Sequence, residues 1–377
     1  MKILFVTCHL PYPPHSGGRL REHQLLARLT QRFEVHIAAV SKTLAEDRAA
    51  VADIPWEHDG VSLFVAAQLA GITGVAPQVA RHRSEAATAG VRDLLARGRF
   101  DVVHVEGFYV WQHLARTRLP TVLVEQNIEW QLFDQQGRLE EAAVTRAAEL
   151  AVWRQAAVLG AVTEEDRSVM EERTGRPAHL IPDGADHLAA PGHAWPPGPG
   201  RSLLMVGNYG YAPNVDGALW LASEVLPRIR AVLPDVRLRL VGASPPREVR
   251  ALEGEAIEVT GRVPDVAPYI DDADVVVCPL RFGGGVKVKV LEALTSGKAI
   301  VSTEIGCQGL GSARTAVRVA DCAGGFAGAC LELLRNPASR ARAERAAAAV
   351  PLPTWDDAAE ALAHCWHLVA RRSLAAA

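Results

Sequence analysis

The sequence has 377 residues, of which 49% are hydrophobic, and its formal net charge at pH 7 is -3. This length is sufficient for two hydrophobic cores, and the charge lacks the basic excess of nucleic-acid-binding proteins, so we expect no nucleic-acid partner. Six scattered cysteines without a CxxC pair favour a reduced, cytoplasmic protein. The first residues lead directly into a predicted strand rather than a signal peptide, and no apolar run reaches the ~18 residues of a membrane span.

Apolar, β-branched runs in the first half of the sequence predict buried strands. They lie at residues 3–7, 34–40, 61–66, 100–106, 120–130 and 157–163. An amphipathic helix follows the loop Ser16-Gly17-Gly18, and a long helical region is predicted from about Gln131 to Leu159. The segment that begins at Thr163 has the pattern of a helix N-cap followed by acidic residues. Since strand-loop-helix-strand units join parallel strands by right-handed crossovers, we expect a doubly wound α/β sheet.

The loop Ser16-Gly17-Gly18 is the first candidate ligand contact. Ligands of doubly wound sheets bind beyond the carboxyl ends of the strands, and this loop follows the first strand. A simple helix-capping turn is the alternative interpretation of the same residues.

The second half of the sequence predicts another α/β domain. Its expected strands lie at residues 202–206, 237–241, 257–259, 274–280, 299–302 and 316–319. Residues 191–200 are dense in proline and glycine, which is typical of a semi-rigid linker. The predicted domains are therefore residues 1–190 and 201–350. The last segment, 351–377, is predicted to be a helix that either crosses back to cover the first domain or completes the second.

A glycine-rich loop between a buried strand and a helix is the strongest chemical signal in the second domain. Three successive glycines, Gly283, Gly284 and Gly285, let the backbone approach a ligand closely, and the helix start offers unpaired N–H groups. Lys287 and Lys289 add positive charge, and Glu292 follows about one turn later. This arrangement fits a nucleoside diphosphate with its ribose. A tight turn beside a solvated lysine face is the alternative.

Several motifs, in order along nearly the whole chain, resemble those of family 4 glycosyltransferases. In this sequence they occupy residues 16–18, 101–104, 126–129, 181–186, 206–208, 213–215, 240–242, 260–263, 273–274 and 283–301. The resemblance implies the GT-B fold, in which two facing Rossmann-like doubly wound parallel-sheet domains enclose an interdomain cleft. It also implies an acceptor-binding first domain and a nucleotide-sugar-binding second domain.

The resemblance assigns roles to residues of the glycine loop. Glu292 corresponds to the second glutamate of the family's paired-glutamate motif, which holds the nucleotide ribose. The first glutamate is replaced by Gly284, so the chain resembles a branch with a glycine-triplet and lysine motif, in which Lys289 contacts the diphosphate. The expected nucleotide-sugar contacts are Gly17, Gly18, Asn208, Arg262, Gly283, Gly284, Gly285, Val286, Lys287, Lys289 and Glu292.

The resemblance also implies retaining transfer of a sugar, with catalytic candidates at strand ends of the first domain. The candidates are Glu106, His104, Asn127 and Glu129. His104 lies in an apolar run and is equally well interpreted as a core histidine. Glu125 and Glu129 flank Asn127 and alternate in facing, so at most one of them should reach the cleft together with Asn127. We expect no metal and no cofactor, because lysine and helix N–H groups can stabilise the leaving diphosphate.

Two alternatives share the expected fold: a nucleotide-sugar 2-epimerase, and a non-catalytic partner protein. The acceptor stays open among a glycan, a lipid-linked molecule and a small metabolite, and the oligomeric state is also open. Peripheral membrane contact through four arginines of the first helix is the less favoured interpretation, and a solvated helix face is the favoured one. The arginines are Arg19, Arg21, Arg28 and Arg32.

Overall fold

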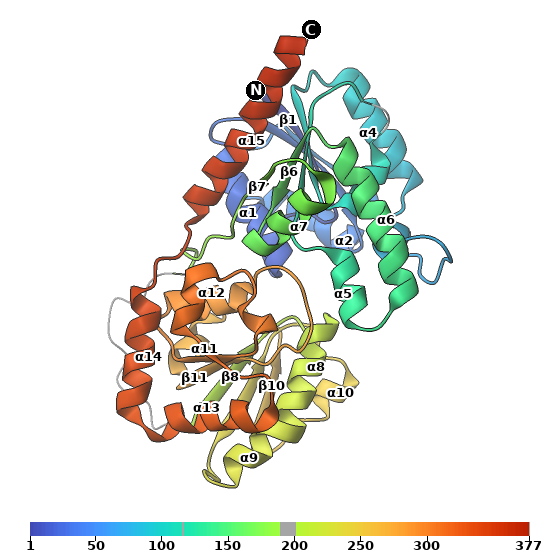
Figure 1. Cartoon of the computed structure of the whole chain (residues 1–377). Coiled ribbons are helices and arrows are strands. Elements are labelled where there is room, and N and C mark those ends of the chain that lie inside the picture. Colours follow the sequence, from blue (N-terminus) through green and yellow to red (C-terminus); the bar gives the residue numbers. More distant parts are fainter. Residues whose placement is uncertain (115–116, 189–200, 377) are drawn as a thin grey trace. The chain divides into compact units, whose positions relative to one another are not determined.

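The computed structural model describes residues 1–114, 117–188 and 201–376, and the chain forms two compact units (Figure 1). One unit, the first domain, comprises Met1–Gly184 together with Thr354–Ala377, and the other, the second domain, comprises Ala185–Pro353. Residues 185–188 therefore pack with the second domain, although the sequence placed the boundary near residue 190. The expected linker, 191–200, lies outside the described residues.

The first domain is built on a parallel sheet of seven strands within the described residues, in the order β3-β2-β1-β4-β5-β6-β7. The strands are β1 (Lys2–Thr7), β2 (Glu34–Ser41), β3 (Gly60–Val65), β4 (Val102–Glu106), β5 (Thr121–Glu125), β6 (Val158–Ala161) and β7 (Ala178–Leu180). The chain order runs outward in opposite directions from β1 and β4. Their carboxyl ends therefore form the topological switch point, where ligands of such sheets bind.

Alternate residues of the central strands serve two separate cores, one on each face of the sheet. Ile3 and Phe5 pack in one cluster, whereas Leu4 and Val6 pack in the other. The first face is covered by α1 (Gly17–Leu29) and α15 (Trp355–Ala376). The second is covered by α4 (Glu85–Arg97), α6 (Leu139–Gln155) and α7 (Glu164–Thr174). This two-faced burial explains why the strands read as continuous apolar runs.

The last helix, α15, packs on the first domain beside α1 (Figure 1). Its apolar residues Ala358, Leu362 and Trp366 are buried, and the Trp366 ring meets Phe33 edge-to-face at 5.2 Å. The acidic residues Asp356 and Glu360 of α15 pair with Arg28 of α1 and with Arg32, which follows α1. Over the described residues, no helix, α15 included, is both long and apolar enough to cross a membrane.

The solvated arginine face that the sequence predicted is contradicted at Arg19 and Arg21, whereas Arg28 of α1 and Arg32, just after α1, are 28% and 45% exposed. Arg19 and Arg21 are buried, and they pair with Asp47 at 2.9 Å and with Asp183 at 2.6 Å, respectively. Arg28 and Arg32 pair with α15. The prediction was wrong at Arg19 and Arg21 because it considered α1 alone, without the chain segments that cover it.

The predicted helix from Gln131 to Leu159 is in fact two helices, α5 (Glu129–Gln135) and α6, because Gly137 adopts a left-handed backbone with φ 70° between them. The cap at Thr163 is confirmed, since its hydroxyl accepts a hydrogen bond from the Asp166 N–H at 3.0 Å. The remaining helical segments of the first domain are α2 (Leu44–Ala50), α3 (Pro77–Arg81), and the 3-10 turns η1 (Val51–Asp53) and η2 (Phe108–His113).

The second domain repeats the same plan with a six-stranded parallel sheet in the order β10-β9-β8-β11-β12-β13. Its strands are β8 (Ser202–Val206), β9 (Arg237–Val241), β10 (Ile257–Gly261), β11 (Val275–Cys278), β12 (Ile300–Ser302) and β13 (Arg318–Val319). Its α-helices are α8 (Ala212–Trp220), α9 (Leu226–Arg230), α10 (Arg247–Arg250), α11 (Ala267–Asp272), α12 (Val288–Thr295), α13 (Ala323–Arg335) and α14 (Pro337–Ala349). The switch point of this domain lies between β8 and β11.

Candidate functional site

The glycine loop of the second domain lies directly at its switch point, between β11 and α12. Gly283 and Gly285 have φ values of 145° and 63°, which side chains other than glycine rarely adopt. The backbone N–H groups at the start of α12 point out of the helix beside this loop, as they do at anion-binding helix termini. Gly297 ends the helix with φ 63°, as the sequence predicted.

Lys289 and Asn214 join the two chain segments that flank the switch point. The Lys289 ammonium donates to Asn214 Oδ1 at 2.5 Å, and Asn214 Nδ2 donates to the carbonyl of Asn208 at 2.8 Å. A Cβ on Gly207 would lie 3.2 Å from Lys289 Nζ, so the loop after β8 approaches this ammonium closely. Burial lowers the pKa of Lys289, an effect that Cys278 and Glu292 oppose. An anion at this place would favour the charged lysine.

Lys287 lies against the glycine loop that precedes it. Its ammonium donates to the carbonyls of Gly285 at 2.6 Å and Gly284 at 3.2 Å, and the residue is only 6% exposed. These bonds brace the glycine loop from within. Lys287 thus bonds to the glycine loop itself, whereas Lys289 faces the neighbouring loop.

Glu292 is held by a residue that the sequence did not identify. His187 Nε2 lies 3.0 Å from Glu292 Oε1, and the two side chains are 6% and 12% exposed. The only sequence signal was indirect, because His187 directly follows the motif at 181–186. This contact leaves one carboxylate oxygen of Glu292 not engaged by His187.

The other expected contacts of the second domain are more widely spread. Asn208 is exposed, and its Oδ1 accepts a hydrogen bond from Gly210 N at 2.9 Å, which shapes the turn after β8. Val286 is partly buried against the apolar core. Arg262 is exposed and follows β10, an edge strand two positions from β8. The structure thus brings together the glycine loop, Lys289 and Asn208, while Gly261, which precedes Arg262, accepts a hydrogen bond from the Gly242 N–H at 3.1 Å.

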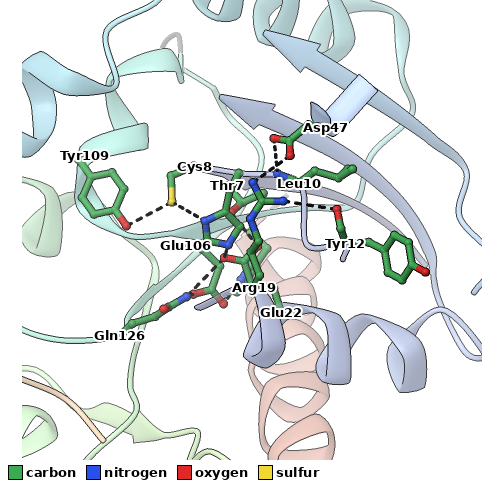
Figure 2. Close-up of polar contacts among 12 residues, drawn as sticks. Thr7, Cys8, Leu10, Tyr12, Arg19, Glu22, Asp47, Glu106, Tyr109 and Gln126 are labelled. Atoms are coloured by element: carbon green, nitrogen blue, oxygen red, sulfur yellow. Dashed lines mark hydrogen bonds and ion pairs between the residues drawn. The ribbon is translucent and has the colours of Figure 1, made fainter. Parts of the chain in front are cut away.

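The first domain has its own polar cluster at the carboxyl ends of β1 and β4, centred on Glu22 of α1 (Figure 2). Glu22 accepts a hydrogen bond from the Thr7 hydroxyl at 2.7 Å and lies 3.0 Å from His9 Nε2. Gln126 bridges Glu22 and Glu106, with distances of 3.4 and 3.3 Å. Burial raises the pKa of Glu22 to about 7, although His9 acts in the opposite direction.

Sequence reasoning missed Glu22, Thr7, His9 and Gln126 as members of this cluster. The glycine loop of the first domain did point to them. A Cβ on Gly18 would lie 2.9 Å from Gln126 Oε1 and 3.3 Å from His9 Cε1. Gly17 and Gly18 open α1, with Ser16 at the cap position. In the described structure the Ser16 side chain makes no capping hydrogen bond. The close approach of Gln126 and His9 therefore explains the glycine at position 18 better than helix capping does.

His104 and Glu106 lie inside the first domain. His104 is fully buried and Glu106 is 1% exposed. Trp366 of α15 donates to His104 Nδ1 at 3.3 Å, which places the ring proton on Nε2, 3.0 Å from Glu106 Oε1. Although burial opposes ionisation, this bond with His104 helps to lower the pKa of Glu106. We therefore assign both residues to the support of the cluster; of the two interpretations of His104, the structure favours the core histidine.

Asn127 and Glu129 form a separate pair beyond β5. Asn127 Nδ2 donates to Glu129 Oε1 at 2.7 Å, and Gln78 donates to the other carboxylate oxygen at 2.9 Å. Glu125 is buried, and its carboxylate accepts hydrogen bonds from Trp153 Nε1 and from the Phe108 N–H. Of the two glutamates, Glu129 contacts Asn127, and Glu125 is bonded within the core.

The two doubly wound domains together define a GT-B fold. Over 100% of both chains, the structure is similar to a sucrose-phosphate synthase from Thermosynechococcus elongatus, with a TM-score of 0.71 and 17% identity. It is also similar to the Anabaena protein HepE solved with UDP and glucose, with a TM-score of 0.67, 13% identity and coverage of 97% and 98%. A protein assigned as a UDP-N-acetylglucosamine 2-epimerase from Listeria monocytogenes matches with a TM-score of 0.64, 15% identity and coverage of 96% and 94%.

Sequence comparison adds a family for the second domain. Residues 200–336 match the model of glycosyl transferases group 1. A phosphatidyl-myo-inositol mannosyltransferase from Mycolicibacterium smegmatis is 31% identical over 153 residues, which are 38% of this chain and 39% of that protein. An uncharacterised protein of the cps region of Klebsiella pneumoniae is 28% identical over 120 residues, 29% of this chain and 31% of that protein. The chain thus matches less than half of the length of these curated relatives.

Proposed function

We propose that the chain is a glycosyltransferase that moves a sugar from a nucleoside-diphosphate sugar to an acceptor, with the donor nucleotide bound by the second domain. One observation carries this proposal. The glycine loop, the start of α12 and the Lys289 ammonium converge at the switch point of a domain with the group 1 sequence pattern. The expected ligand is an anion carrying hydroxyl groups.

In this proposal Lys289 and the N–H groups of α12 bind the diphosphate that leaves with the nucleoside. Negative charge develops on that group as the glycosidic bond breaks, so these donors stabilise the transition state more than the ground state. Glu292 accepts hydrogen bonds from the ribose hydroxyls through the carboxylate oxygen that His187 does not engage. With these groups in place the reaction needs no metal ion and no cofactor.

The finer features of the reaction are proposed from the motif resemblance. They are retention of configuration at the transferred carbon, membership of family 4, and an acceptor hydroxyl on a glycan, a lipid-linked molecule or a small metabolite. The mannosyltransferase relative supports a sugar donor. We place the acceptor in the first domain, where the cluster around Glu22 lies at the corresponding switch point.

Nucleotide binding is the first test. We would measure the melting temperature and the heat of binding with UDP, GDP, ADP, CDP and TDP, with and without magnesium. We expect one nucleotide to stabilise the protein without magnesium, and Lys289→Ala and Glu292→Ala to remove that stabilisation. Lys42→Ala, which removes an exposed lysine of the first domain, is the matched control. Unaltered binding in Lys289→Ala would contradict the proposed site, and binding by none of the nucleotides would favour a non-catalytic partner.

The fold alone does not separate a transferase from a nucleotide-sugar 2-epimerase, because both occur among the structural neighbours. The family match in residues 200–336 favours the transferase. Product analysis with the nucleotide sugar of the preferred base distinguishes them. We expect a released nucleoside diphosphate and a glycosylated acceptor, whereas an epimerised nucleotide sugar formed without acceptor would support the alternative.

A further inference from the structure

Cys8 lies directly after β1, beside the cluster around Glu22, and its sulfur is surrounded by hydrogen-bond donors (Figure 2). His9 Nδ1 is 3.2 Å from the sulfur, and the hydroxyl of Tyr109 is 3.6 Å from it. Cys8 is partly exposed, unlike Cys278, which is buried in the second domain. Neither the sequence motifs nor the proposed transfer reaction use this thiol.

His82 provides a second, independent observation. Its ring stacks on Tyr109 at 4.5 Å, and its Nδ1 is 2.7 Å from the carbonyl of Gln78. The residue is 2% exposed, and among the described residues its Nε2 has no hydrogen-bond partner, while the ring helps to lower the pKa of the Cys8 thiol. Two imidazole rings and a phenol therefore face one sulfur atom.

Cys8, His9 and Glu22 are arranged as a nucleophile, a base beside it and a third group that orients the base. His9 bridges the thiol and the carboxylate, with Nδ1 toward the sulfur and Nε2 toward Glu22 Oε1. Glu22 is in turn held by the Thr7 hydroxyl. A nucleophile next to a base that a third group orients is the general signature of thiol and hydroxyl activation.

The local charges favour the thiolate. Burial alone would raise the pKa of Cys8, but the charges of His9 and His82 and the hydrogen bond with His9 outweigh it and hold the pKa well below its ordinary value. Burial lowers the pKa of His9, but Cys8 and Glu22 raise it by more, so that this pKa lies well above its ordinary value. By contrast, burial raises the pKa of Cys307 to about 11. The titratable groups that act on this thiol or are acted on by it are His9, Glu22, His82 and Tyr109, whereas Glu106 acts on Glu22.

We propose that Cys8 is a modification site, an activated thiolate that hydrogen peroxide oxidises to a sulfenic acid. The thiolate sulfur attacks one peroxide oxygen, an S–O bond forms as the O–O bond breaks, and the departing hydroxide takes a proton from solvent to become water. The sulfur loses two electrons, which the peroxide gains. Low pKa and partial exposure are the properties that select such cysteines for oxidation.

The test compares Cys8 with Cys322, an exposed cysteine of the same chain. The reduced full-length protein is treated at pH 6 with iodoacetamide, and separately with substoichiometric hydrogen peroxide followed by a dimedone-type probe. Labelling of each cysteine is then quantified by peptide mass spectrometry. An ordinary thiol is only about 0.3% ionised at this pH. We expect Cys8 to be alkylated at least roughly tenfold faster than Cys322 and to carry the sulfenic acid label.

Two variants show whether the neighbours cause the reactivity. His9→Gln should slow the labelling of Cys8 at pH 6 about tenfold and leave that of Cys322 unchanged, and Tyr109→Phe should have a smaller effect in the same direction. Labelling of Cys8 in the wild-type protein that is no faster than that of Cys322 would overturn the proposal, whether or not the variants fold. Because these readouts report chemistry at the thiol, they do not depend on sugar transfer.

Discussion

The two domains have the same strand order at their centre but present different chemistry at the switch point. In the second domain, a glycine loop exposes backbone N–H groups beside the Lys289 ammonium. In the first, side chains of β1, α1 and the loop after β5 form a network of carboxylates and imidazoles around Glu22. The topology therefore determines where a ligand can bind, whereas the loop residues determine which ligand it is.

The difference also appears in how the key groups are ionised. Burial lowers the pKa of Lys289, and a bound anion would shift that pKa in the opposite direction. In the first domain, burial raises the pKa of Glu22 to about 7 and that of Glu125 to about 8. The proposed anion site of the second domain therefore contains a buried ammonium, whereas the first domain contains carboxyl groups whose pKa values lie near or above 7.

The largest effect is expected from Lys289→Ala, which removes the ammonium group from the proposed diphosphate site of the second domain. Turnover of the nucleotide sugar should fall about 10²–10³-fold, because one preorganised donor to a developing anion is typically worth that factor. Steady-state kinetics with and without EDTA provides the measurement, and circular dichroism checks the fold. Lys42→Ala should retain full activity. Turnover of Lys289→Ala near the wild-type level, or a strict requirement for a divalent cation, would contradict the assigned role.

A pH effect of intermediate size is expected from Glu125 in the first domain. Its pKa is about 8 in the folded protein and near 4.5 as an ordinary carboxyl, so the folded state keeps a proton that the unfolded state has lost. This contribution to stability is complete below about pH 4.5 and is lost as the pH rises toward 8. Between pH 5 and 8, the wild-type protein should lose about 3–4 kcal/mol more unfolding free energy than Glu125→Gln.

Urea unfolding at pH 5 and pH 8, followed by hydrogen exchange of β5 amides, measures this difference. Glu57→Gln is the control, because Glu57 is exposed in the same domain. Equal pH dependence in the wild-type protein and Glu125→Gln would show that Glu125 is already ionised at pH 5.

The smallest effects compare the glycine loops of the two domains. Gly285→Ala forces a side chain into a left-handed backbone with φ 63° and should cost about 1–2 kcal/mol of unfolding free energy. Gly18→Ala meets Gln126 Oε1, the end of a side chain that can move, so its cost should be smaller, below about 1 kcal/mol. Urea unfolding of both variants tests the order. A larger cost for Gly18→Ala would mean that the space beside Gln126 is more rigid than the backbone argument assumes.

The sequence predicted the elements of the fold well where a local pattern decides them. The strand preceding the glycine loop, the helix stop at Gly297 and the cap at Thr163 follow from residues within a few positions of one another. The split between α5 and α6 was missed because one glycine between two helical patterns is a weak signal. The burial of Arg21 was missed because its partner Asp183 lies 162 residues away.

The candidate site shows the same division. The sequence by itself determined two parallel α/β domains, the glycine loop and the position of Lys289, because periodicity and backbone freedom are local properties. The tertiary structure alone decided that Trp366 binds His104, that His187 holds Glu292, and that Cys8, His9 and Glu22 meet at one strand end. The physical reason is that strand order and the packing of helices on each face determine which distant side chains share a buried, polar space.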